Sequence, residues 1–170
     1  MSDRPAPPPS LPENQFAIRR GVLALCAQSA WSALNEFILP DGRRADVMAL
    51  MPDGRLACIE IKSGPLDFRL DMKWPNYRAW CDVLYFAVDT AFPLALLPVD
   101  TGVMTVATSD RILPGIVPEA AVLRAPPSHP LSPARRRILV TLFARVAADR
   151  LMRLEDPMMS ASLRSARRVD

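Results

Sequence analysis

The stretch from Glu36 to Lys62 reads EFILPDGRRADVMALMPDGRLACIEIK and contains the tripeptide Pro-Asp-Gly twice. Proline suits the first corner position of a type I turn, aspartate suits the next position, and glycine supplies the left-handed residue that follows. This combination is the common three-residue loop of a β-hairpin. The stretch therefore predicts three antiparallel strands joined by two tight turns.

The two turns also predict which residues lie opposite one another. A loop at residues 52–54 places Asp46 opposite Glu60, and a loop at residues 40–42 places Glu36 opposite Asp46. Three carboxylates are then expected side by side on one face of the sheet. Because directly opposed like charges destabilise a sheet, we expect a divalent cation, Mg²⁺ or Mn²⁺, to offset them.

One of the few lysines joins this predicted row. The chain has 19 arginines but only two lysines, Lys62 and Lys73. Since side chains alternate along a strand, Lys62 is expected on the same face as Glu60. A lysine ammonium is a compact, movable point charge, whereas the arginine guanidinium is a planar fork. The presence of lysine rather than arginine at position 62 indicates a need for such a point charge beside the carboxylates.

The composition is that of a globular chain with no predicted membrane span. Half of the 170 residues are hydrophobic, but no apolar run is long enough to cross a bilayer. The sequence predicts a disordered Pro-rich lead at 1–12, a single domain at 13–155 and a basic flexible tail at 156–170. The net charge is +3, with many arginines in the last third, which favours a polyanionic partner. The alternative is a solvated helix face and tail.

The cysteines and the single histidine argue against several kinds of site. Cys26, Cys58 and Cys81 have no CxxC spacing, and their odd number indicates free thiols in a reducing compartment. His129 is the only histidine and lies in a Pro-rich segment, which disfavours zinc sites and Ser-His-Asp or Cys-His catalysis. Catalysis is then left to carboxylates, lysines, tyrosines and a metal ion.

Periodicity and turn signals predict a helix, three antiparallel strands, a second helix and a strand parallel to the third. Pro75 fits the first turn of the second helix, and Ser132 followed by Pro133 predicts the start of a long C-terminal helix. The predicted elements are helices at 13–30, 75–81 and 132–154, strands at 31–39, 44–50, 55–62, 83–88 and 103–107, and an irregular segment at 111–130 with a short strand at 112–113.

This order resembles the core of the PD-(D/E)XK phosphodiesterase superfamily, which has the restriction-endonuclease-like fold. The resemblance rests on an acid from the second strand, Asp46, and on Glu60, Ile61 and Lys62 from the third. Ala45 stands where many members have proline. The resemblance implies an α/β fold with an αβββαβ core, a mixed sheet flanked by helices and, in this chain, an extra C-terminal helix.

The same resemblance implies catalytic roles. Asp46 and Glu60 would bind Mg²⁺ or Mn²⁺, with the Ile61 carbonyl as a third ligand. Lys62 would orient the attacking water or stabilise the charge of the transition state. Glu36 would complete the metal shell, although a simple strand-end carboxylate suits its position equally well.

Three further residues are expected to contact the substrate. Lys73 and Tyr77 have a K-x-x-x-Y spacing similar to the Q-x-x-x-Y element of some superfamily members, and with Arg44 they would contact a phosphate. Packing and surface charge are the alternative for Lys73 and Tyr77. The alternative for the acids is plain ion pairing, with Arg44 and Lys62 as partners.

A narrower resemblance is to the bacterial MmcB family of DNA-repair-associated proteins. It rests on the segments GRRADVMAL, IEIKSG, DFRLDMKWPNYRAWCD, YFAVD and FPLALLP and on a late ARRR helix, and it covers roughly residues 15–155. It implies a role in DNA damage repair in the cytoplasm of a bacterium. It also implies DNA as a partner, and a homodimer or other repair proteins as further partners.

These features predict a metal-dependent DNA phosphodiesterase, that is, a nuclease, acting in DNA damage repair. A second hypothesis is a catalytically inert DNA-binding or adaptor protein on the same fold. A third is an unrelated mixed-sheet domain whose acids bind a structural cation or nothing.

Overall fold

The computed structural model describes residues 11–108, 116–156 and 158. The chain divides into two compact units, Met1–Leu131 and Ser132–Asp170, which are described separately below. The predicted lead overlaps the first helix by two residues; residues 1–10 and nearly all of the predicted tail lie outside the described part. The single domain expected over residues 13–155 stays a prediction.

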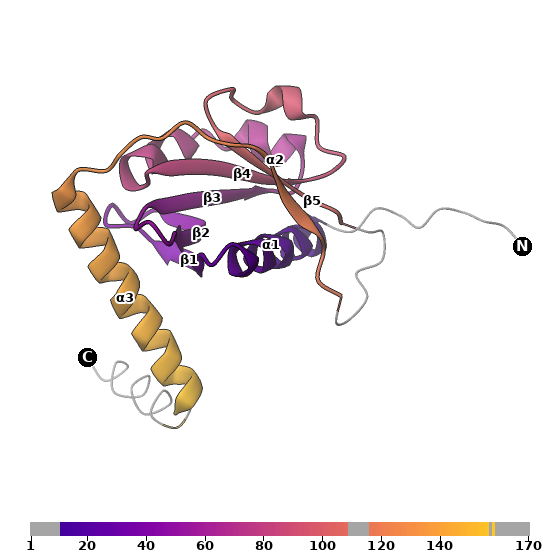
Figure 1. Ribbon diagram of the computed structural model, residues 1–170. Coiled ribbons are helices and arrows are strands. Elements are labelled where there is room, and N and C mark those ends of the chain that lie inside the picture. Colours follow the sequence, from indigo (N-terminus) through magenta and orange to yellow (C-terminus); the bar gives the residue numbers. More distant parts are fainter. Residues whose placement is uncertain (1–10, 109–115, 157, 159–170) are drawn as a thin grey trace, which may run out of the picture. The chain divides into compact units, whose positions relative to one another are not determined.

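The first unit is built on one six-stranded sheet (Figure 1), which is mixed as the sequence predicts but has a sixth strand that the sequence does not predict. The strands pair in chain order, antiparallel from β1 to β3, parallel from β3 to β5, and antiparallel from β5 to β6. Their bounds are β1 Ser32–Ile38, β2 Arg44–Leu50, β3 Leu56–Lys62, β4 Val83–Asp89, β5 Gly102–Val106 and β6 Ala120–Arg124.

Both Pro-Asp-Gly tripeptides form the predicted hairpin turns. Gly42 and Gly54 adopt φ values of +82° and +81°, the left-handed conformation that glycine adopts without strain. The amide of Met51 donates to the carbonyl of Arg55 at 2.9 Å, and that of Leu39 donates to the carbonyl of Arg43 at 2.7 Å. The observed pairs between β1 and β2 and between β2 and β3 follow the predicted register.

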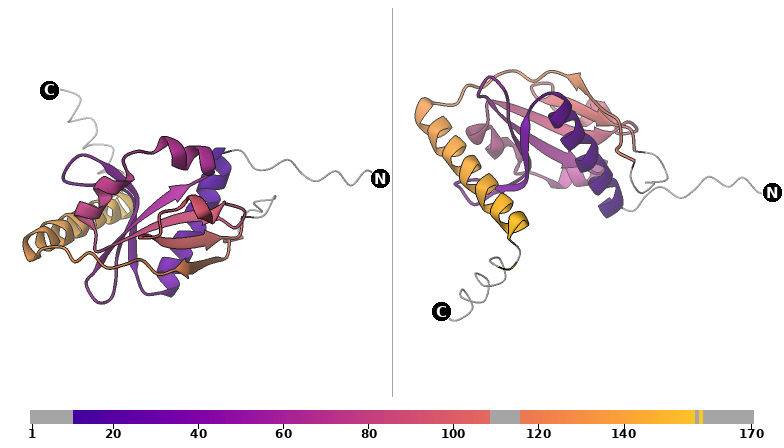
Figure 2. Two further views of the ribbon diagram at one scale, coloured as in Figure 1. Left: turned by 90° about the horizontal axis from the view of Figure 1, so that it is seen from above. Right: turned by 60° about the horizontal axis from the view of Figure 1, so that its bottom comes forward.

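Helix α1 (Leu11–Gln28) covers one face of the sheet, which is visible in Figure 1 and in both views of Figure 2. Its buried residues Ile18, Val22 and Cys26 pack on the small and branched side chains of the central strands. Gly21 lies in this stripe, where an added Cβ would meet Val106 Cγ1 at 2.6 Å. The residues between α1 and the sheet therefore form an apolar core, in which the backbone of α1 lies close to the strands.

The opposite face is covered by shorter elements. These are α2 (Pro65–Leu70) and two 3₁₀ helices, η1 (Trp74–Trp80) and η2 (Leu94–Leu96). Phe68 of α2 and Trp74 of η1 pack edge-on against Phe86 of β4, with ring centroids 5.3 and 5.4 Å apart. The sheet is therefore apolar on both faces, as predicted.

The crossover from β3 to β4 differs from the prediction. The sequence predicts one α-helix beginning at Pro75, but the structure has α2 earlier and a 3₁₀ helix at the predicted place. Pro65 and Pro75 each stand at the start of a helix, where proline's missing amide hydrogen costs nothing. Two helix starts ten residues apart leave room only for short helices.

Strand β6 was also missed, because it lies inside the segment 111–130 that was expected to be irregular. Backbone pairing with β5 stabilises this strand, although the prolines on either side of it in the sequence are typical of irregular structure. The short strand predicted at 112–113 lies outside the described residues. The three cysteines are free, as predicted, and all three are buried.

The second unit contains helix α3 (Pro133–Glu155), close to its predicted bounds. The side chain of Ser132 caps it by accepting a hydrogen bond from the backbone amide of Arg135. None of the helices in the described part of the chain is long and apolar enough to cross a membrane.

Candidate active site

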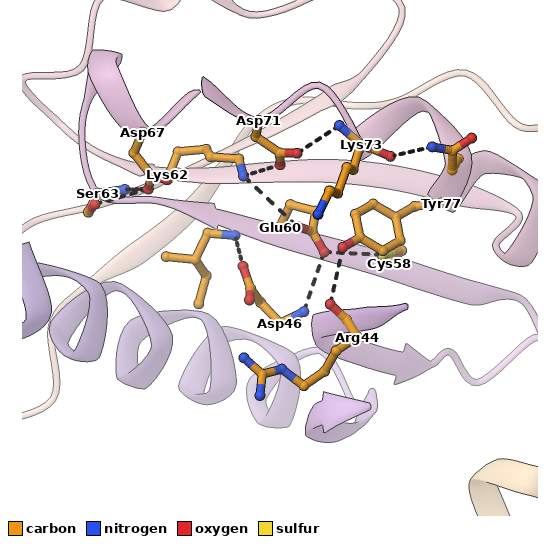
Figure 3. A network of polar contacts seen from close by, with 12 residues as sticks. Arg44, Asp46, Cys58, Glu60, Lys62, Ser63, Asp67, Asp71, Lys73 and Tyr77 are labelled. Atoms are coloured by element: carbon orange, nitrogen blue, oxygen red, sulfur yellow. Dashed lines mark hydrogen bonds and ion pairs between the residues drawn. The ribbon is translucent and has the colours of Figure 1, made fainter. Parts of the chain in front are cut away.

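Asp46 and Glu60 meet where β2 and β3 separate. The ladder between these strands ends at Val47 and Ile59, one residue short of the two acids. Beyond that point side chains replace the backbone bonds. Asp46 Oδ2 accepts from the Ile61 amide at 2.8 Å, and the Asp46 amide donates to Glu60 Oε1 at 3.3 Å (Figure 3). The structure thus brings together three of the predicted residues.

Glu36 does not continue this row. Its φ of +49° is left-handed, which is uncommon for a residue with a side chain and takes it out of the β pleat. The pairing of β1 with β2 passes over it, although the register on either side is as predicted. Its carboxylate instead forms ion pairs with Arg19 at 3.6 Å and Arg44 at 2.6 Å. The alternation rule fails here because the backbone is not extended.

Across the described residues, no three histidine, cysteine, aspartate or glutamate side chains are grouped so as to hold one metal ion. The predicted row of three adjacent carboxylates is therefore not formed. Asp46 and Glu60 remain as a pair. Two carboxylates match what Mg²⁺ commonly takes from a protein, since it keeps several waters and also binds substrate phosphates.

The environment of the pair disfavours two negative charges. Glu60 is 3% exposed, and burial followed by the charge of Asp46 raises its pKa to about 8, although Lys62 acts in the opposite direction. Burial also raises the pKa of Asp46, against the Ile61 hydrogen bond and Lys62. An added cation would favour the ionised form of both groups.

We predict that this environment makes the stability of the metal-free protein fall between about pH 4.5 and pH 8. The unfolded chain releases the Glu60 proton near pH 4.5, whereas the folded protein keeps it until about pH 8. Over that window the folded state binds more protons, so the free energy of unfolding falls as pH rises, by up to about 1.4 kcal/mol per pH unit for one group.

Urea denaturation in EDTA at several pH values measures this slope. Glu60→Gln is expected to flatten it, because glutamine does not titrate, and Glu119→Gln at an exposed position is the matched control. An equally steep slope in wild type and Glu60→Gln would show that Glu60 does not carry the effect.

Lys62 is buried beside Glu60, but its shortest contact is with Asp71. The side chain is 5% exposed, and its Nζ lies 2.5 Å from Asp71 Oδ2 and 4.0 Å from Glu60 Oε2. Asp71 Oδ1 also accepts from the Lys73 amide at 2.9 Å. Although partial burial opposes it, the hydrogen bond from Lys62 lowers the pKa of Asp71. Sequence reasoning missed Asp71, because nothing local indicates which acid a buried lysine will meet.

Lys73 and Tyr77 do not form the predicted phosphate-contacting pair. Residues four apart share a face of an α-helix, but a 3₁₀ helix has about three residues per turn. Lys73, just before η1, is exposed and in Figure 3 extends toward Glu60, whereas Tyr77 is buried and donates to the carbonyl of Arg44 at 3.1 Å. Burial raises the pKa of Tyr77. Tyr77 thus ties η1 to β2, and the Arg44 side chain points to Glu36.

A pocket of about 160 Å³ lies beside Asp46 on the α1 face of the sheet. Sequence reasoning missed its α1 residues, because they belong to a helix that reads as core. The pocket is lined by Gln15, Phe16, Arg19, Glu36, Asp46 and Ile61.

Comparison with known proteins gives one family and one similar structure. A family model described as "DNA repair protein MmcB-like" matches residues 2–158. The SPO1766 protein of unknown function from Silicibacter pomeroyi is 37% identical, with a TM-score of 0.74, over 85% of this chain and 92% of that chain. The two share the mixed-sheet fold. No curated protein matches the chain.

Proposed function

Because the chain belongs to the MmcB-like family of DNA repair proteins, we propose that it is a metal-dependent DNA phosphodiesterase of the restriction-endonuclease-like, PD-(D/E)XK type. The observation that carries the proposal is the group of two carboxylates and a lysine where β2 and β3 separate, in which Glu60 and Lys62 are buried and Asp46 is partly buried. Buried charges are costly unless they are paired or coordinate a metal ion, and strongly perturbed carboxyl groups concentrate at functional sites.

The residues present fit a divalent cation. Asp46 and Glu60 offer oxygen ligands from adjacent strands. Burial disfavours the ionised form of both carboxyl groups, which a bound cation would stabilise. They would hold Mg²⁺ or Mn²⁺ together with the Ile61 carbonyl. When bound, such an ion lowers the pKa of a water molecule and offsets charge on a phosphate. The amide of Ile61 fixes the orientation of Asp46 for this task.

Lys62 would serve the reacting phosphate directly. Its buried stem fixes the position of the ammonium, which can donate to a water or to a phosphate oxygen as charge develops there. Asp71 holds the ammonium at the edge of the carboxylate pair, so Asp71 is a positioning residue in this scheme. Glu36 lines the pocket beside the pair and is ion-paired with Arg44, and both would contact the substrate rather than the metal.

The test is DNA cleavage with and without metal. Plasmid, single-stranded and branched DNA are incubated with Mg²⁺, Mn²⁺ or EDTA. We expect cleavage only with metal, and none by Lys62→Met, which keeps an apolar stem but removes the charge. Arg55→Ala, which removes an exposed cation at a distant turn, is the matched control and should cleave normally. Absent cleavage, or equal cleavage by Lys62→Met, contradicts the proposal.

A catalytically inert DNA-binding or adaptor protein is the second candidate. The observation in its favour is that the Lys62 ammonium contacts Asp71 more closely than either acid of the pair. Salt-sensitive DNA binding without cleavage under any metal condition would support this candidate.

A further inference from the structure

The pocket beside Asp46 contains an aromatic ring that the core does not explain. Phe16 is 48% exposed, whereas the adjacent Ala17 and Ile18 of α1 are completely buried. The core stripe of α1 therefore begins next to Phe16 and leaves its ring at the surface. A large exposed aromatic at a polar pocket is commonly a contact surface for a planar ligand.

One arginine lies over this ring, and a second arginine shares its carboxylate partner. The guanidinium of Arg19 lies 5.4 Å from the centroid of the Phe16 ring, and Arg19 and Arg44 both contact the carboxylate of Glu36. Two guanidinium groups share one carboxylate, so the cluster keeps one net positive charge. Both arginine side chains are accessible, at 32% and 64% exposure. Guanidinium groups match phosphate oxygens through paired hydrogen bonds.

The pocket thus combines a stacking surface, the guanidinium of Arg19 and the acid Asp46 within one small hollow of the first unit. Arg44 does not line this hollow but pairs with Glu36, which does. A base inside a duplex is stacked on both faces and paired along its edge, so it cannot lie on Phe16. An unpaired base can, and stacking on an aromatic side chain accepts any of the four bases. The phosphate attached to such a base would lie between the arginines, beside Asp46.

We propose that this pocket receives one unpaired nucleotide of single-stranded DNA, with its base on Phe16 and its phosphate at Arg19 and Arg44. The proposal rests on the proposed function, since it names the substrate class of the same site. It assigns to the protein a preference for single strands, gaps or frayed ends over intact duplex, with no preference for base sequence.

Binding in EDTA tests the pocket without requiring cleavage. Labelled single-stranded and blunt duplex oligonucleotides of equal length are titrated with protein, and fluorescence anisotropy gives the dissociation constants. Wild type is expected to prefer the single strand. Phe16→Ala and Phe16→Leu should weaken single-strand binding about tenfold or more and leave duplex binding unchanged. Phe16→Trp should retain the preference, because it keeps a ring face.

Val99→Ala is the matched control, since Val99 is an apolar residue 88% exposed outside the pocket, and it should bind as wild type does. Equal losses for single strand and duplex, or normal single-strand binding by Phe16→Leu, would overturn the inference. Cleavage of the same oligonucleotides with Mg²⁺ separates the two proposals. A Phe16-dependent preference without cleavage refutes the nuclease proposal but supports the nucleotide pocket. Cleavage without that preference supports the nuclease proposal but refutes the nucleotide pocket.

Discussion

Asp46→Asn is expected to slow metal-dependent DNA cleavage about a thousandfold or more, equivalent to about 4 kcal/mol of lost transition-state stabilisation. The substitution removes one of the two negative charges that would hold the cation. It leaves the local structure intact, because the amide oxygen of asparagine can still accept the hydrogen bond from the Ile61 amide. The loss therefore falls on chemistry and metal affinity rather than on the fold.

Single-turnover cleavage over a range of Mg²⁺ concentrations measures this effect, and DNA binding in EDTA shows whether the fold and the substrate surface persist. Glu36→Gln is the informative comparison. Because Glu36 pairs with arginines, its loss should change cleavage by less than about tenfold and act mainly on substrate affinity. Near-normal cleavage by Asp46→Asn would remove Asp46 from the catalytic site.

Asp71→Ala is expected to lower the free energy of unfolding by about 3 kcal/mol. The Asp71 side chain is 19% exposed and that of Lys62 is 5% exposed, so this ion pair is largely withdrawn from water. Its removal leaves a buried ammonium whose one remaining ion pair in the described structure is with the more distant Glu60 carboxylate, at 4.0 Å. The backbone amide of Lys73 also loses its acceptor.

Urea denaturation of wild type, Asp71→Ala and the double variant Lys62→Met/Asp71→Leu measures the pair. Lys62→Met/Asp71→Leu should be more stable than Asp71→Ala, since an apolar pair leaves no unpaired buried charge. Asp53→Ala, which breaks the exposed ion pair with Arg55 and a turn hydrogen bond from the Arg55 amide, is the control and should cost about 1 kcal/mol or less. Equal effects of Asp71→Ala and Asp53→Ala would show that the contact with Lys62 contributes little.

The register of the first three strands was predictable because it depends on local turn chemistry. Each Pro-Asp-Gly turn fixes the residues on either side of it, and counting outward places Asp46 beside Glu60. The parallel fourth strand was predictable for a similar reason, since the apolar run at 83–88 follows a crossover of sufficient length.

The remaining parts depend on contacts that only the folded chain creates. The left-handed backbone of Glu36 accompanies ion pairs with Arg44 and with Arg19 of a helix distant in sequence. Asp71 becomes important only because α2 ends where Lys62 is buried. Strand β6 forms because β5 offers an edge, not because of its own sequence. In each case tertiary structure overrides the local pattern.

The two identical turns are unequal places at which to attach a label. The Asp41 side chain of the first accepts a hydrogen bond from the indole of Trp80 at 2.8 Å, so this turn is tied to η1. The Asp53 side chain of the second pairs with Arg55 of the same hairpin, and about 15 Å of strand separates that turn from Asp46. A fluorophore or affinity tag joined at residue 53 would leave the proposed DNA binding and cleavage undisturbed. The same attachment at residue 41 would loosen η1, the element that carries Tyr77.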